Sequence, residues 1–237
     1  MVIERALNSG APQVEELSIV PEPSAQERYP NFGQADIELL EECCQKLAEK
    51  QDINAVTDKL EALLHKYPDE PALLNNLSTA LYISDRKERS NKLLDRLVES
   101  YPNYPIGKIN WAHRQLDSGN IDPVLTLLKS GWTLNRFCPD REEFYPQEVI
   151  GFCLLVVRLS LVLEQLEAAD LFLGFAEEVA EAFDCDSREL EQASEMITLH
   201  TIQSEGFVEE MVRYLGKEKE SEKTRKNRKK KSRSSGK

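Results

Sequence analysis

The stretch Tyr67-Pro68-Asp69-Glu70-Pro71 recurs 34 residues later as Tyr101-Pro102-Asn103-Tyr104-Pro105. Each copy follows an amphipathic segment with helical spacing and precedes another. Proline interrupts a helix interior but fits the first helical position, where its missing N–H would have no partner anyway. Each stretch is therefore predicted to end one helix pair and to begin the next. A period of 34 residues is typical of helix-turn-helix solenoids.

Apolar residues at intervals of three and four mark the helices between these stretches. The first helix is expected to begin near Asp36, an N-cap candidate, and a second helix returns from a turn at residues 50–52 and stops at Tyr67. Gly119 is expected to adopt the left-handed conformation that ends a later helix. The helices predicted after Tyr67 cover residues 71–85, 88–101, 105–118 and 124–128.

The second half of the chain departs from this regular spacing. Residues 132–145 carry Pro139 and several charges, which indicates a longer connection with at most a short turn. Helices are expected again over 146–164, 167–183, 187–204 and 207–215, where the last elements cover the open end of the solenoid. We therefore predict an all-α, right-handed helix-turn-helix solenoid over 35–216, between a loose, disordered N-terminal arm (1–34) and a disordered basic tail (217–237).

The charges are distributed unevenly along the 237 residues. The whole chain carries 30 Lys and Arg against 42 Asp and Glu, a net charge of -12. Residues 217–237 hold 11 basic and 3 acidic side chains, a local charge of +8, which leaves the first 216 residues at -20. An acidic body with a basic tail predicts a tail that attracts anionic partners and a body that repels them.

The cysteines and the apolar segments are informative about cellular location. Five cysteines without CxxC spacing, and a beginning that lacks the pattern of a signal peptide, favour a reducing cytoplasmic location. The longest apolar run, 149–163, contains Arg158 and is too short to cross a bilayer, so no membrane span is expected. Nuclear import through the basic tail is the alternative in a eukaryotic source.

The segment from Pro71 to Leu81 resembles the first helix of a tetratricopeptide (TPR) repeat. In that family a large apolar residue, a leucine, a small residue and an aromatic or apolar residue occupy the fourth, seventh, eighth and eleventh places, which here are Leu74, Leu77, Ser78 and Leu81. The stretch 119–125 resembles the turn between the two helices of a repeat, and Pro68 and Pro102 match its closing proline. The resemblance implies repeats over 37–70, 71–104 and 105–138, and a degenerate fourth near 150–183.

Three residues of the third unit depart from the pattern of the family. Lys108 replaces the large apolar residue, Gln115 the usual tyrosine, and Arg136 the closing proline. The small eighth residue, required where paired helices approach closely, is present in all three units as Cys44, Ser78 and Ala112.

The resemblance also implies a binding groove. In the family the first helices of successive repeats line a concave face, and an Asn at the sixth place bonds the backbone of an extended peptide; Asn76 and Asn110 occupy that place here. Asn is also common at this family position, which is an equally good explanation of the pair. The residues expected to face the groove are Asn75, Asn76, Thr79, Tyr82, Asn110, His113 and Asp117.

The chemistry of the partner is constrained by the fifth places of the repeats. Family members that clamp carboxylates carry Lys or Arg beside the Asn, whereas this chain has Glu41, Asn75 and Ile109 there. Carboxylates meeting an acidic groove lose affinity. A neutral, apolar or basic protein segment is therefore the expected guest, and no small-molecule substrate is expected.

No pattern in the sequence indicates catalysis. The three histidines, His65, His113 and His200, are far apart and lack a second ligand at metal-binding spacing. Phosphate-binding loops, nucleophile elbows and HExxH motifs are missing from the sequence. We expect neither enzymatic activity nor a metal or cofactor, and interpret the protein as a scaffold or adaptor.

The polybasic tail supports an alternative function, that of an RNA- or ribosome-associated factor. Counterion release from phosphates requires only cations, and the tail lacks aromatic residues for base stacking. Nucleic-acid or ribosome tethering, nuclear import and a merely solubilising role all remain open for it. The cations of the central stretch are Lys223, Arg225, Lys226, Arg228, Lys229, Lys230, Lys231 and Arg233.

Overall fold

The computed structural model describes residues 2–4, 14–129 and 131–203. The chain divides into two compact units, Met1–Leu190 and Glu191–Lys237. In the first unit the helices pair in chain order: α2 (Gln34–Glu49) with α3 (Ile53–Lys66), α4 (Pro71–Ile83) with α5 (Lys87–Ser100), α6 (Pro105–Asp117) with α7 (Ile121–Leu127), and α9 (Pro146–Val162) with α10 (Leu166–Phe183).

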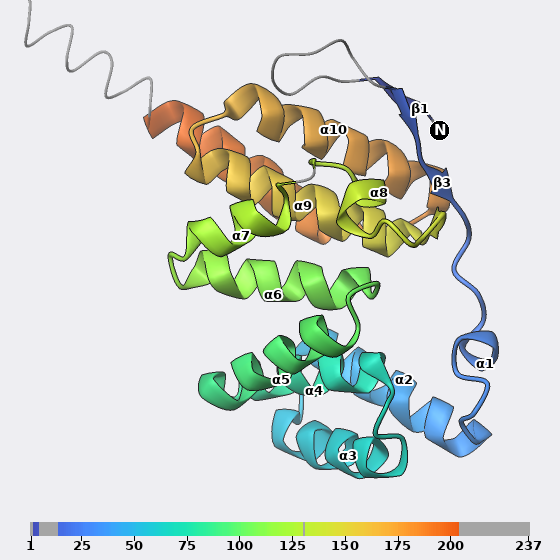
Figure 1. Cartoon of the computed structure of the whole chain (residues 1–237). Coiled ribbons are helices and arrows are strands. Elements are labelled where there is room, and N and C mark those ends of the chain that lie inside the picture. The colour runs from blue at the N-terminus through green and yellow to red at the C-terminus, as the bar shows by residue number, and fades with distance from the viewer. Residues whose placement is uncertain (1, 5–13, 130, 204–237) are drawn as a thin grey trace, which may run out of the picture. The chain divides into compact units, whose positions relative to one another are not determined.

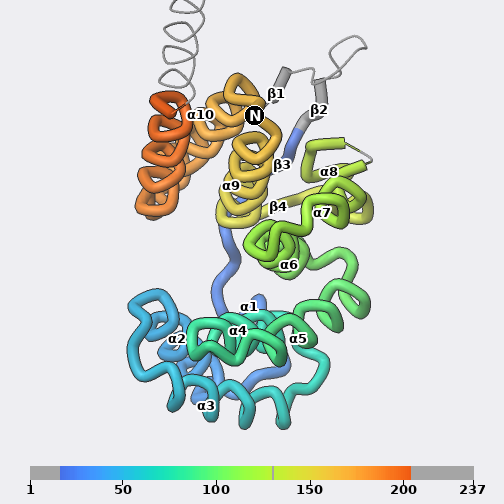
Figure 2. Tube along the Cα trace, turned by 90° about the vertical axis from the view of Figure 1, so that its left-hand side faces the viewer, coloured from blue at the N-terminus to red at the C-terminus, as the bar shows by residue number. Residues whose placement is uncertain are grey.

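Successive pairs are joined by packing between neighbouring helices (Figure 1). Helix α3 packs on α4 and α5 packs on α6, while the first helices α2, α4, α6 and α9 also contact one another in turn. The trace in Figure 2 follows the same order from α2 to α10. This sequential packing confirms the predicted all-helical solenoid. The predicted helix over 207–215 and the tail over 217–237 lie outside the described residues. The helix predicted over 187–204 is described as far as residue 203.

Proline and left-handed residues set several helix boundaries as predicted. Pro71, Pro105 and Pro146 each stand at the start of a helix. Lys50 ends α2 with φ of 55°, and Gly119 follows α6 with φ of 74°. In such positions glycine avoids the steric cost that a side chain carries.

The predicted role of Asp36 needs correction. Helix α2 begins at Gln34 with Gly33 as its N-cap, so Asp36 lies inside the first turn. Its carboxylate accepts a hydrogen bond from the Tyr67 hydroxyl at 2.7 Å and pairs with Lys66 at 2.5 Å. These bonds tie the start of α2 to the end of α3, which residue type alone did not reveal.

Leucine-rich faces form the core between α2, α3 and α4. Leu40, Leu60, Leu73 and Leu77 are essentially inaccessible to solvent, and each such side chain contributes about 1.5–3 kcal/mol by burial. The cysteine pair sits one position away from its expected register. Cys43 is buried and Cys44 is exposed, although Cys44 was expected at the packing position.

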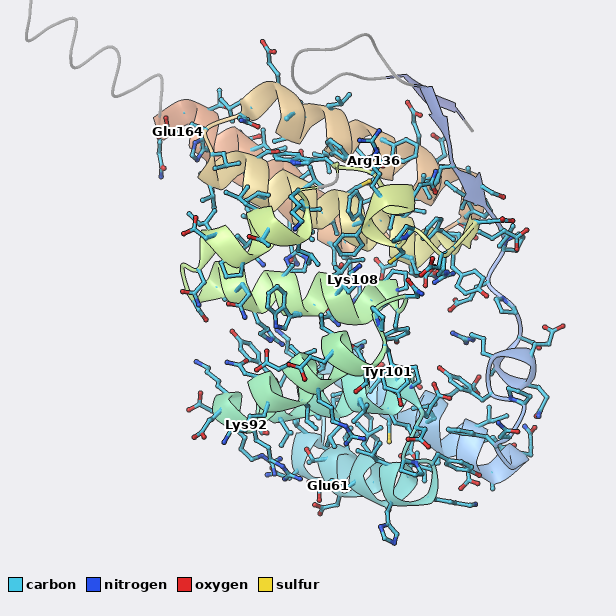
Figure 3. The ribbon with its side chains drawn as sticks, in the orientation of Figure 1. Glu61, Lys92, Tyr101, Lys108, Arg136 and Glu164 are labelled. Carbon is cyan, nitrogen blue, oxygen red and sulfur yellow. The ribbon has the colours of Figure 1, made fainter. Side chains whose placement is uncertain are left out.

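The connection between α7 and α9 is more structured than predicted. It holds the short helix α8 (Leu134–Phe137) and strand β4 (Glu143–Phe144). Lys108 of α6 is buried, donates a hydrogen bond to the Phe137 carbonyl, and places its ammonium 4.5 Å from the centre of the Phe137 ring (Figure 3). Its alkyl stem fills the place of the expected apolar residue, while its charged end binds the end of α8.

The second half of the predicted N-terminal arm makes specific contacts. Strand β3 (Ser18–Ile19) pairs in parallel with β4, and helix α1 (Ala25–Arg28) begins with a capping box at Ser24. Phe32 is buried and stacks on Tyr67 with ring centroids 3.8 Å apart. Residues 17–33 are thus not a loose arm. Nearer the terminus, β1 (Val2–Glu4) pairs antiparallel with β2 (Val14–Glu16).

Gly107 near the start of α6 allows α5 and α6 to approach closely. A Cβ atom there would lie 2.6 Å from Cδ2 of the buried Leu97 and 2.9 Å from Tyr104. We predict that Gly107→Ala lowers the free energy of unfolding by about 1–3 kcal/mol, because the side chains must shift to admit the methyl group. Urea denaturation measures this change.

Gly174→Ala provides the matched control in α10. A Cβ atom at that position meets no heavy atom within 4 Å, so the substitution is expected to raise stability by about 0.5–1 kcal/mol through helix propensity alone. Equal stabilities of the two variants would contradict the close contact at Gly107.

Candidate functional site

A row of polar side chains connects the first helices of the pairs. We define the polar row as Cys44 of α2, Asn75, Asn76 and Tyr82 of α4, Asn110, His113, Arg114 and Asp117 of α6, and Arg158 of α9. Helices α2, α4, α6 and α9 contact one another in this order, and the row takes side chains from all four. The row therefore extends across four helix pairs.

Two asparagine contacts form the beginning of the row. Asn76 Nδ2 lies 3.4 Å from the Cys44 sulfur. Asn110 Nδ2 donates a hydrogen bond to Asn75 Oδ1 at 2.8 Å, and Asn75 is itself buried. The partly buried Thr79 hydroxyl donates to the Asn75 carbonyl of its own helix at 3.1 Å. The amides of Asn75 and Asn110 thus already bind one another, and Asn76 is bound to Cys44, so a guest would share or replace these bonds.

Tyr82 and Asp117 join α4 to the end of α6. The Tyr82 hydroxyl donates to Asp117 Oδ2 at 3.2 Å. The guanidinium carbon of Arg114 lies 3.1 Å from the centre of the Tyr82 ring, a stacked cation-π contact. Arg114 Nη1 is 3.5 Å from Asp117 Oδ2, longer than the usual 2.7–2.9 Å of a charged hydrogen bond.

Arg158 connects α9 to two residues of α6. Its Nη2 donates to Asp117 Oδ1 at 2.7 Å, and its Nη1 lies 2.9 Å from His113 Nδ1. Arginine has only donors, so Nδ1 must accept and the proton of the neutral imidazole resides on Nε2. Arg158 and Asp117 are about one-third exposed, which leaves this part of the row open to solvent.

The surroundings set the protonation states in this cluster. Burial, with the nearby charge of Arg158, lowers the pKa of His113 to about 4, so the ring is neutral at pH 7. Burial alone would raise the pKa of Asp117, but the hydrogen bond and charge of Arg158 outweigh it and hold this pKa below its usual value. Burial also lowers the pKa of Arg114, which remains protonated because its ordinary value is so high.

Sequence reasoning identified part of the row. Of the predicted residues, Asn75, Tyr82, Asn110 and Asp117 form the two hydrogen-bonded pairs between α4 and α6, and His113 lies beside them. Whether these residues form a binding groove stays a prediction. Arg158 and Arg114 were missed as members, although Arg158 is the only charged residue within the apolar run 149–163 and its isolation was a usable signal.

Among the described residues, no group of three or more His, Cys, Asp or Glu side chains is placed to hold a metal ion. No helix in the same part of the chain combines the length and apolar character needed to cross a membrane. Comparison of the chain with protein-family models, with curated proteins and with solved structures finds no match.

The neutral state of His113 predicts a pH dependence of stability. The unfolded chain takes up a proton at this residue below about pH 6.5, whereas the folded chain does so only near pH 4. Stability is therefore lost as the pH falls through this window, by about 3 kcal/mol. Urea unfolding at pH 6.5 and at pH 4 should show a smaller loss of unfolding free energy for His113→Gln than for the unaltered protein. An imidazole that titrates near pH 6.5 in NMR spectra of the folded protein would contradict this assignment.

Proposed function

We propose that the protein is a non-enzymatic scaffold or adaptor that binds a peptide or protein segment along the polar row. The observation that carries the proposal is the alignment of polar side chains from four successive first helices, on elements whose other faces are filled with leucine. An extended chain advances about 3.3 Å per residue, and packed helices lie about 8–10 Å apart. Side chains about three residues apart in an extended guest would therefore reach neighbouring helices of the row.

The resemblance to TPR repeats supports the same function, because that family binds protein segments with its first helices. The low chemical reactivity of the row also supports binding over catalysis. His113 is held by Arg158 rather than by a nucleophile, so the imidazole is not placed as a general base. The expected cytoplasmic location remains part of the proposal.

Substitution in the middle of the row tests this function. Asn76→Arg places a long cation between α2 and α4, and is expected to reduce capture of partner proteins from a nuclease-treated lysate at least about 10-fold, because it blocks the shared surface. The matched control is Asn91→Arg on the exposed side of α5, which introduces the same residue elsewhere. Quantitative mass spectrometry of the captured proteins gives the measurement.

Circular dichroism and thermal unfolding must show that both variants are folded. If Asn76→Arg and the double variant Asn76→Ala/Asn110→Ala retain every partner that the unaltered protein captures, the row is not the binding surface. Loss of partners with Asn91→Arg alone would assign binding to the opposite side of the helix pairs.

We propose as a second candidate that the basic tail tethers the protein to RNA or to the ribosome. The supporting observation is the charge of +8 within residues 217–237, next to a body of -20. Here the tail would supply affinity by counterion release, and the helices would only position it.

Deletion of residues 217–237 separates the two candidates. Fluorescence anisotropy with a labelled poly-uridine RNA should show binding by the full chain that weakens steeply with salt, and no binding by the truncated chain. Protein capture through the polar row should survive the deletion. A full chain that fails to bind RNA at moderate salt would remove the second candidate.

A further inference from the structure

We infer that the segment bound along the polar row presents an oxyanion, a carboxylate or a phosphate, to Arg114 and Arg158; this deepens the proposed function and rests on it. The two guanidinium groups come from neighbouring first helices, α6 and α9, and both lie beside Asp117 at one end of the row. Their arrangement differs from the expectation of a neutral, apolar or basic guest, which considered only the fifth places of the repeats.

Donors outnumber acceptors at this end of the row. Each guanidinium offers five N–H donors, and the Tyr82 hydroxyl offers one more. The two oxygens of Asp117 accept from Arg158 at 2.7 Å, from Tyr82 at 3.2 Å and from Arg114 at the longer distance of 3.5 Å. Arg114 Nε is buried and has no acceptor among the described residues. One carboxylate therefore serves two cations, and Arg114 is the less well satisfied.

The remaining neighbours do not remove the positive charge. His113 accepts from Arg158 as a neutral ring and contributes no negative charge. Lys87 lies 5.7 Å from the centre of the Tyr82 ring and pairs with the exposed Asp85 at 3.4 Å. The cations Arg114, Arg158 and Lys87 thus exceed the anions Asp117 and Asp85 by one charge. A basic group from a guest would add repulsion here, whereas an oxyanion would balance the cluster.

The two arginines are held in place before a guest arrives. Arg114 is stacked on Tyr82 and its side chain is 17% exposed, while Arg158 is fixed by His113 and Asp117 and is 33% exposed. A guanidinium already ordered loses less conformational entropy on binding, and it presents a planar pair of donors to an oxyanion. The acidic side chains elsewhere on the body repel an anionic guest only weakly, because charges more than about 8 Å away from it are screened at physiological salt.

A double-mutant cycle between protein and peptide tests the inference. Random peptides displayed on phage are first selected on the full-length protein and filtered for those that Asn76→Arg no longer binds. One selected peptide is then synthesised with Asp, phosphoserine, Asn or Lys at each acidic position in turn. We expect Asp→Asn to weaken binding about 10- to 100-fold, as for a charged hydrogen bond in a partly buried site.

For the variant Arg158→Gln, the affinities of the Asp and Asn peptides should differ by less than about 2-fold, because the arginine that pairs with the Asp carboxylate is gone. Arg158→Lys keeps the charge without the planar donors and should fall between. Arg89→Gln on α5, which removes an exposed arginine paired with Glu61 at 2.8 Å, is the matched control and should leave the full difference. The stronger of the Asp and phosphoserine peptides identifies the source of the oxyanion.

NMR of the unaltered protein provides a second test that does not depend on the folding of Arg158→Gln. The side-chain Nε–H signals of Arg114 and Arg158 should shift with the Asp peptide and stay in place with the Asn peptide. Selected peptides that need the polar row but lack acidic residues, and that bind Arg158→Gln unchanged, would overturn this inference and leave the proposed function intact. Failure to select any peptide sensitive to Asn76→Arg would instead contradict the proposed function.

Discussion

The order of the helix pairs depends on leucines of the second helices that are buried against the flanking first helices. In α5, Leu94 and Leu97 pack with Leu74 of α4, and Tyr104 and Trp111 at α6 cover the same cluster. At the contact between α5 and α6, Gly107 leaves the room that the side chain of Leu97 occupies. Because the apolar residues are directed into this packing, the first helices are left with a separate side on which polar residues can align.

Much of this architecture followed from local sequence signals. Proline at the starts of α4, α6 and α9 and left-handed residues at Lys50 and Gly119 act through backbone geometry, which each residue carries with it. The features that were missed involve partners far apart in sequence. Strand β3 pairs with β4 across more than a hundred residues, and Phe32 stacks on Tyr67, contacts that no helical period encodes.

The polar row shows the same division between local and distant information. Family spacing placed Asn75 and Asn110 on one side of the helices, where they form a hydrogen bond across 35 residues. Arg158 is 41 residues from Asp117, within the apolar run 149–163, and spacing gave no reason to pair them. A charged residue in an apolar helix must find a partner or reach solvent, and Arg158 does both. Such a residue is therefore better evidence for a site than the overall charge of the chain.

The internal hydrogen bonds of the row favour selectivity over tight binding. A guest that replaces the bond between Asn75 and Asn110 exchanges one amide contact for another, with a net gain of only about 0.5–1.5 kcal/mol at best. An oxyanion of the guest beside Arg114 Nη1 would add a charged contact to a group whose distance to Asp117 Oδ2 is 3.5 Å in the free protein. For the proposed guest, affinity should therefore depend most on the end of the row near α9, where charge is unbalanced, and the asparagines would set the register of the bound segment. Under the proposed function, discrimination among partners would rest on the position of one acidic group relative to the asparagine pair, a distance set by the packing of α4, α6 and α9.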